Sequence, residues 1–111
     1  MAVDVSTAKA AVTLEEIKEH LRLDTTEENS LLELYALAIT QRAEHILGRA
    51  LITREGQEGY GDKPAAVPAA IRHWILLHVA QAYENRETKM DEALSTIPFA
   101  DALLSPFKTW S

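Results

Sequence analysis

The sequence predicts an all-α protein, a small bundle of two long helices with shorter N- and C-terminal helices. Two stretches of about twenty residues repeat apolar side chains at helical spacing. Residue types typical of helix starts precede both stretches. All four glycines and two of the four prolines fall in residues 48–68, between the stretches. We therefore expect a loop or a short extended segment between the two long helices.

The composition is that of one ordinary globular domain. The chain has 111 residues, of which 47% are hydrophobic and 25% charged. We expect residues 1–11 to form a flexible N-terminal segment and residues 12–111 to form a single helical domain. Cysteine is absent, which excludes disulfides, thiolate metal sites and cysteine nucleophiles. The longest strongly apolar run, residues 74–80, is far shorter than the ~20 residues of a membrane-spanning helix, so we expect no membrane association.

The charge balance argues against tight binding of nucleic acid. Seventeen acidic and eleven basic residues give a net charge of −6, and the basic residues are scattered. A protein that grips phosphates needs clustered Lys and Arg. A negative surface would matter where DNA has to pass nearby without sticking.

The first helix has a clear start. Thr13 is a suitable N-cap, and Glu16 three residues later completes a capping box. Val12 and Ile17 occupy the positions of a hydrophobic staple around that cap. We expect this helix to end near Leu23.

The second helix is predicted to follow the cap residues Asp24-Thr25-Thr26 and to run to Leu47, with Gly48 as its C-terminal cap. Such a helix is roughly 31 Å long. Its predicted apolar face contains Leu31, Tyr35, Ala38, Ile39, Ala43 and Ile46, widened by Leu32, Leu34 and Leu47.

The third helix is predicted to begin at Pro68 and to run to about Glu87. Its middle has hardly any polar face, so we expect it to be buried on nearly all sides, in part against another subunit. Residues 54–64 carry three glycines and a proline, and we expect a flexible loop that docks a partner and becomes ordered on assembly. A short C-terminal helix is predicted after Pro98.

No constellation of residues predicts catalysis. His73 and His78 are five residues apart on the third helix and therefore do not share a face as an i, i+4 pair would. Gly56, Gly59 and Gly61 lack the spacing of a phosphate-binding loop. Helix starts and solvated faces account for the acidic residues. We expect a protein that is not an enzyme and that binds no cofactor and no metal.

The end of the third helix is a candidate contact site. Tyr83, Glu84 and Arg86 lie in its densest polar and aromatic cluster. One interpretation is an interface in which Arg86 pairs across a subunit boundary. The other is a helix end whose charged side chains simply face water. The sequence leaves both open.

Three further residues are candidates for contacts. Phe107 and Trp110 lie near the C-terminus, where they either fold back onto the core, which burial statistics favour, or insert into a neighbour. Arg49 directly follows Gly48 and either interacts with the last carbonyls of the preceding helix or, less expectedly, contacts a partner.

Four segments together resemble a known family. They are residues 12–24 (VTLEEIKEHLRLD), residues 46–51 (ILGRAL), a proline-started helix that runs into residues 83–87 (YENRE), and residues 98–110 (PFADALLSPFKTW). In this order and spacing they resemble phage head–tail connector proteins of the HK97 gp6-like type, also labelled DNA-packaging connectors. The resemblance spans residues 12–110. The segment between Leu51 and Pro68 departs from it, because relatives often carry a longer, strand-bearing insert there.

The resemblance implies a structural protein of the virion head–tail junction that is assembled in the host cytoplasm. Family members form a homo-oligomeric ring beneath the portal protein. The ring extends the DNA channel and receives the stopper or tail-completion proteins.

An alternative function is a small helical regulatory module that binds nucleic acid or a host protein. It requires a basic face on which Arg42, Arg49, Arg54 and Arg72 converge. The position of these four side chains therefore separates the two hypotheses.

Overall fold

A computed structural model describes residues 3–24, 26–84 and 102–107. These residues are helical and contain no strand, which confirms the predicted fold class. The elements in chain order are η1 (Val5–Thr7), α1 (Leu14–Leu21), α2 (Asn29–Leu47), η2 (Pro64–Ala66), α3 (Ala69–Glu84) and η3 (Ser105–Phe107).

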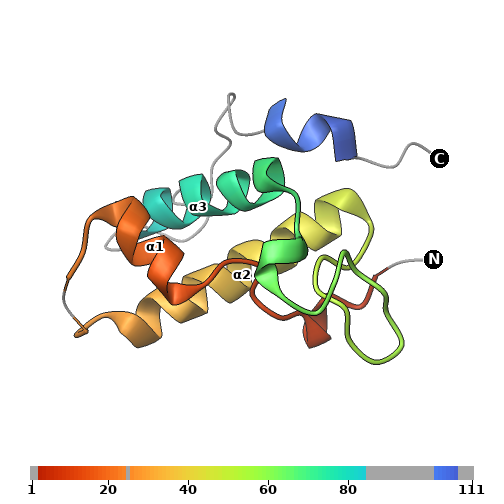
Figure 1. The fold of residues 1–111 in the computed structure, drawn as a ribbon, viewed down its shortest axis with the longest axis horizontal. Helices are drawn as coiled ribbons and strands as arrows, with labels where there is room; N and C mark the ends of the chain where they lie inside the picture. The colour runs from red at the N-terminus through yellow and green to blue at the C-terminus, as the bar shows by residue number, and fades with distance from the viewer. Residues whose placement is uncertain (1–2, 25, 85–101, 108–111) are drawn as a thin grey trace.

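The two long helices form the body of the molecule. α2 and α3 run side by side in opposite directions, and α1 packs at the end where α2 begins and α3 ends (Figure 1). Trp74 is the largest fully buried side chain. The core around it draws on all three helices and on the loop after α2, and includes Ile17, Leu32, Ile39, Leu47, Leu51, Ile71, Ile75 and Val79.

The start of α1 is as predicted. The Thr13 hydroxyl accepts a hydrogen bond from the Glu16 N–H (3.1 Å), and the Glu16 carboxylate accepts one from the Thr13 N–H (3.0 Å). Val12 and Ile17 are both buried beside this capping box. The helix ends at Leu21, because Arg22 takes the left-handed conformation with φ 58° and closes the last turn.

α2 begins later than the sequence predicts. Its N-cap is Glu28, whose side chain makes no capping hydrogen bond, and its first helical residue is Asn29. The predicted cap therefore belongs to the connection, although Thr25 lies outside the described residues. The predicted end is confirmed, since Gly48 has φ 71° and its N–H donates to the Glu44 carbonyl at 2.8 Å.

The buried face of α2 also differs from the predicted one. Leu34 and Ile46 were assigned to it, but 59% and 37% of their surfaces are exposed. Thr40 and Glu44 are fully buried instead. These two polar side chains face inward because other parts of the chain supply their hydrogen-bond partners, as described below.

α3 begins as predicted, but its middle is not buried on nearly all sides within this chain, since Leu76, Leu77 and Ala80 are half-buried. The Pro68 carbonyl accepts hydrogen bonds from the Ile71 and Arg72 N–H groups, which opens the first turn. The His78 ring stacks on Trp74 with ring centroids 4.1 Å apart. The predicted end at Glu87 lies outside the described residues.

The described part of the C-terminal segment folds back onto the helices. Residues 102–104 form a helical turn that leads into η3. Leu104 is buried in the core, and Leu103 and Phe107 pack against it. Phe107 therefore follows the favoured interpretation, whereas Trp110 lies outside the described residues.

Candidate functional site

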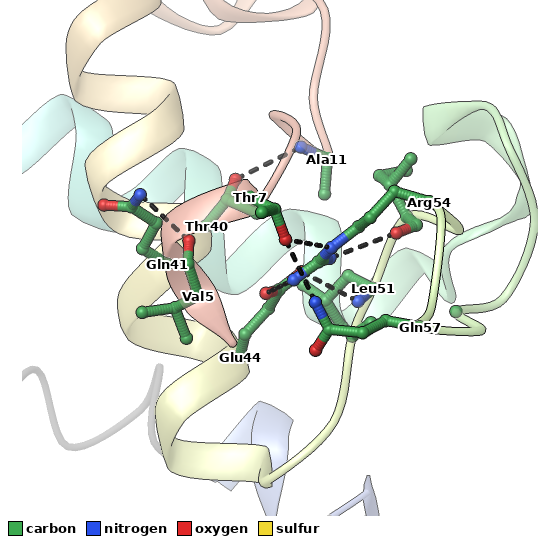
Figure 2. A network of polar contacts seen from close by, with 12 residues as sticks. Val5, Thr7, Ala11, Thr40, Gln41, Glu44, Leu51, Arg54 and Gln57 are labelled. Carbon is green, nitrogen blue, oxygen red and sulfur yellow. Dashed lines mark hydrogen bonds and ion pairs between the residues drawn. The ribbon is translucent and has the colours of Figure 1, made fainter. Parts of the chain in front are cut away.

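The most specific polar arrangement centres on Glu44 near the end of α2. Its side chain is completely buried. The carboxylate accepts hydrogen bonds from the Leu51 N–H (3.0 Å) and, in bidentate fashion, from Nη1 and Nη2 of Arg54 (2.7 and 2.8 Å; Figure 2). Burial of a charged pair is tolerated only where the geometry satisfies both groups in this way.

Arg54 uses all five of its N–H donors. Besides its bonds to Glu44, Nε donates to the Thr7 hydroxyl (3.1 Å), and Nη1 and Nη2 donate to the carbonyls of Ile52 (3.1 Å) and Asp4 (2.8 Å). The hydrogen bonds that Arg54 donates to Glu44 raise the pKa of Arg54 above its ordinary value, with smaller contributions from the charges of Glu44 and Asp4 and an opposing effect of burial. The guanidinium is therefore a permanent charge that joins three segments, which are α2, the loop after α2 and the N-terminal residues.

The third of these segments is residues 4–11, here called the N-terminal strap. The Gln57 side chain pairs with the Asp4 backbone, accepting from its N–H (2.7 Å) and donating to its carbonyl (3.1 Å). Gln41 donates to the Val5 carbonyl (3.0 Å). Residues 1–11 were predicted to be a flexible segment, and within the described part of it polar side chains distant in sequence contact the strap (Figure 2).

The second end of the strap is fixed to α2. The Ala11 N–H donates to the Thr40 hydroxyl (3.1 Å), which in turn donates to the Ala36 carbonyl (2.6 Å). Ala11 is fully buried. Thr40 and Glu44 are four residues apart and so lie on the same face of α2. This face is the one that the strap and the loop cover.

The loop after α2 is also ordered. Tyr60 donates its N–H to the Leu51 carbonyl (2.9 Å), and Arg54 and Gln57 exchange two backbone hydrogen bonds of 2.9 Å. A Cβ at Gly59 would lie 2.4 Å from the Leu51 carbonyl oxygen, so only glycine permits this close approach. Contacts within the chain therefore hold this loop against α2 and the strap, and its docking to a partner stays a prediction.

A groove lies between the strap, α1 and the first half of α2. Its volume is about 430 Å³. The strap contributes Lys9 and α2 contributes Glu33 to its lining. The rest of the lining is apolar and includes Ala10, Val12, Leu14, Ile17, Ala36 and Leu37. Because the strap forms one wall, the contacts that fix the strap also shape the groove.

The structure separates the residues that the sequence nominated for contacts. Tyr83 packs half-buried against the core and Glu84 is exposed, both at the end of α3. Arg49 lies at the end of α2, which is the opposite end of the antiparallel pair (Figure 1). Its guanidinium carbon is 3.9 Å from the centre of the Tyr60 ring, and its Nε donates to the Ala50 carbonyl. Arg86 lies outside the described residues.

The sequence did not identify Glu44 or Gln57 as contact residues, and Arg54 was considered only as part of the basic face that the alternative function requires. One signal was available, because Thr40 and Glu44 interrupt an otherwise apolar helix face at a spacing of four residues. Their partners are far away in the sequence, and no local pattern identifies them.

The described ranges contain no group of three or more His, Asp or Glu side chains placed to hold a metal ion. Within the same ranges, no helix has both the length and the apolar character needed to cross a bilayer.

Comparison with known proteins completes the description. The sequence matches the family described as phage gp6-like head-tail connector protein over residues 11–105. No curated protein and no solved structure matches the sequence. The family match covers most of the 111 residues and includes α1, α2, α3 and the start of η3. The chain therefore belongs to the phage gp6-like head–tail connector family and is a structural component of the phage virion.

Proposed function

We propose that this connector protein assembles into a ring between the portal protein and the stopper or tail-completion proteins, and that the ring extends the channel through which DNA passes. The family match over residues 11–105 carries this proposal. Assembly takes place in the host cytoplasm before the protein becomes part of the head–tail junction. In this role the protein works by contacts alone and needs no cofactor.

The charge distribution supports a channel that does not hold DNA. The net charge is −6. Of the four arginines that a basic face would require, Arg54 is buried against Glu44 and Arg72 is paired with Glu16 at 3.0 Å. Arg49 stacks on Tyr60. These engagements within the chain count against the regulatory module that binds nucleic acid, and no observation favours that module.

The end of α3 remains a proposed contact with a neighbour. Of the two residues described there, Glu84 is exposed, whereas Tyr83 is half-buried against the core. Glu84 is therefore the better test of an interface, because a change at Tyr83 also affects folding. Arg49 and Phe107 have partners within their own chain, and we propose a structural role for both.

The test is size-exclusion chromatography with light scattering over a wide concentration range, with and without the cognate portal. We expect a large closed oligomer, or co-elution with the portal, and electron microscopy should show rings. A chain that stays monomeric and ignores the portal at every concentration would overturn the proposal. Salt-sensitive binding to DNA at physiological ionic strength would favour the regulatory alternative instead.

A further inference from the structure

Two large apolar side chains stand out on the surface of the described residues, and both belong to α2. They are Leu34, which is 59% exposed, and Ile46, which is 37% exposed. Isolated exposed apolar side chains are common on protein surfaces. Here one of the two side chains lies near a carboxylate and the other near a guanidinium, so the surfaces around them carry opposite charges.

The first setting is the groove beside the strap. Leu37 lines it from α2, and Leu34 lies one turn earlier on the same helix. Glu33 also lines the groove and precedes Leu37 by four residues, so the two side chains are neighbours on the helix surface. Glu33 is exposed and forms no ion pair with any residue in the described ranges. This surface is an apolar groove with a free carboxylate on its α2 wall.

The second setting is on the other half of α2. Arg42 precedes Ile46 by four residues and is exposed, as is the adjacent His45. Arg42 makes no hydrogen bond or ion pair within the part of the chain that the structure describes, in contrast to Arg54 and Arg72. This surface is an apolar side chain with a free guanidinium one turn before it.

The two surfaces lie on opposite sides of the helix. Leu37 and Ile46 are nine residues apart, and so are Glu33 and Arg42. Nine residues are about two and a half turns of an α-helix, so the members of each pair point half a turn apart. A head-to-tail contact between identical chains requires two different, complementary surfaces on opposite sides of the subunit.

We propose that a second copy of this chain docks its Ile46 surface into the groove, with its Arg42 against Glu33 and its Ile46 against Leu37. The charges are of opposite sign, and the charged residue precedes the apolar one by four positions on both surfaces, so the two α2 helices run in parallel. This inference rests on the proposed ring and names its subunit contact.

The contact constrains the ring geometry. Its two surfaces are offset by about 14 Å along α2, at 1.5 Å per residue. A closed ring permits no translation along its own axis. α2 therefore cannot run parallel to the ring axis, because the offset would then displace each subunit along that axis. Lys9 also lines the groove, on the strap wall. Among the described residues that line the groove, Glu33 is the only acidic one.

Charge reversal provides the first test, measured as the concentration at which half of the protein is assembled. Glu33→Arg and Arg42→Glu should each raise this concentration by about tenfold or more, because each places like charges together. The double variant E33R/R42E should assemble close to the wild-type concentration, since it restores an opposite pair. Glu58→Arg and Arg22→Glu make the same charge changes at other exposed sites and should have little effect. Circular dichroism shows whether each variant is folded.

Cross-linking provides the second test, because the wild-type chain has no cysteine. A mixture of the Glu33→Cys and Arg42→Cys variants, treated with a short bis-maleimide, should give cross-linked dimers. Each variant alone should give none. Dimers formed by Glu33→Cys alone would indicate a two-fold contact and would overturn the proposal.

The outcomes separate the interface from the ring. If the wild-type protein forms rings but neither charge reversal weakens them, the interface is wrong and the ring stands. If the wild-type protein does not self-associate with or without the portal, both proposals are wrong. Loss of assembly in each single reversal with recovery in the double variant would support the interface.

Discussion

The α2–α3 core and the polar junction, in which Glu44, Arg54 and Gln57 meet the strap, hold the chain together by different means. Around Trp74, which is 1% exposed, apolar side chains such as Ile71 and Ile75 pack in all directions. At the junction, Arg54 and Gln57 hold the strap through hydrogen bonds to its backbone and to Thr7. The core is stabilised by burial of apolar area, which is non-directional, and the junction by directional hydrogen bonds, which are buried at Glu44 and exposed at the strap.

This difference predicts how each region responds to substitution. A core tolerates changes that conserve volume and loses stability in proportion to the cavity created. A buried polar junction behaves as a unit, because removing one partner leaves the others desolvated and unsatisfied. The following predictions test this contrast, in order of expected effect.

Trp74→Ala should have the largest effect, lowering the free energy of unfolding by about 4 kcal/mol. Trp74→Phe should cost clearly less, because Phe refills part of the cavity and the Trp74 Nε1–H has no hydrogen-bond partner among the described residues. Urea denaturation followed by circular dichroism measures both. Equal losses for the two variants would mean that the indole N–H, and not the volume, matters at this position.

Glu44→Gln should cost about 3 kcal/mol, because the buried guanidinium of Arg54 loses its counter-charge. Arg54→Met should also destabilise the protein. The double variant E44Q/R54M should lose much less than the sum of the two single losses, since neither charge is then left unpaired. Additive losses in the same urea experiment would contradict the description of the junction as a unit.

Thr40→Val keeps the side-chain volume and removes the acceptor for the Ala11 N–H. We expect a loss of about 1–2 kcal/mol, the cost of one unsatisfied buried donor. Amide hydrogen exchange should show faster exchange at Ala11, while residues in the middle of α3 stay protected. Uniform acceleration throughout the chain would show that the strap and the core open together.

The smallest predicted effect is a loss of stability at acidic pH. The hydrogen bonds from the Ser6 hydroxyl and N–H hold the pKa of Asp4 below its ordinary value of 3.8, with a smaller contribution from the charge of Arg54. Because the folded pKa is the lower one, this contribution is complete above pH 3.8 and is lost as the pH falls through the folded pKa. NMR titration should show the Ser6 amide shifting in that range before the core unfolds. In Asp4→Asn this shift should be absent.

The same contrast explains which parts of the fold the sequence predicts. The capping box at Thr13, the terminal glycine at position 48 and the start after Pro68 are local signals, and the structure confirms all three. The junction is not local, because Arg54 lies ten residues from Glu44 and fifty from Asp4. Hydrophobic periodicity therefore identified the helices and misassigned the side of α2 that the strap covers.

The candidate contact residues show a similar limit. Aromatic and charged clusters at Tyr83 and Phe107 were conspicuous in the sequence, yet both aromatic rings pack against their own core. Surfaces for a neighbour depend on which side chains the fold leaves exposed. Leu34 and Ile46 were predicted to be buried, but the structure leaves both exposed.

The position of the strap has a consequence for biosynthesis. Residues 4–7 leave the ribosome first, but Gln57, which pairs with Asp4, is 53 positions later in the chain. At ordinary rates of translation, the wait is roughly 3 to 10 seconds. Glu44 is synthesised only ten residues before Arg54, so its carboxylate stays hydrated and without its guanidinium for roughly 0.5 to 2 seconds of that time. A nascent chain arrested before residue 54 should therefore carry a protease-sensitive N-terminus, and one in which α3 has also left the ribosome should protect it.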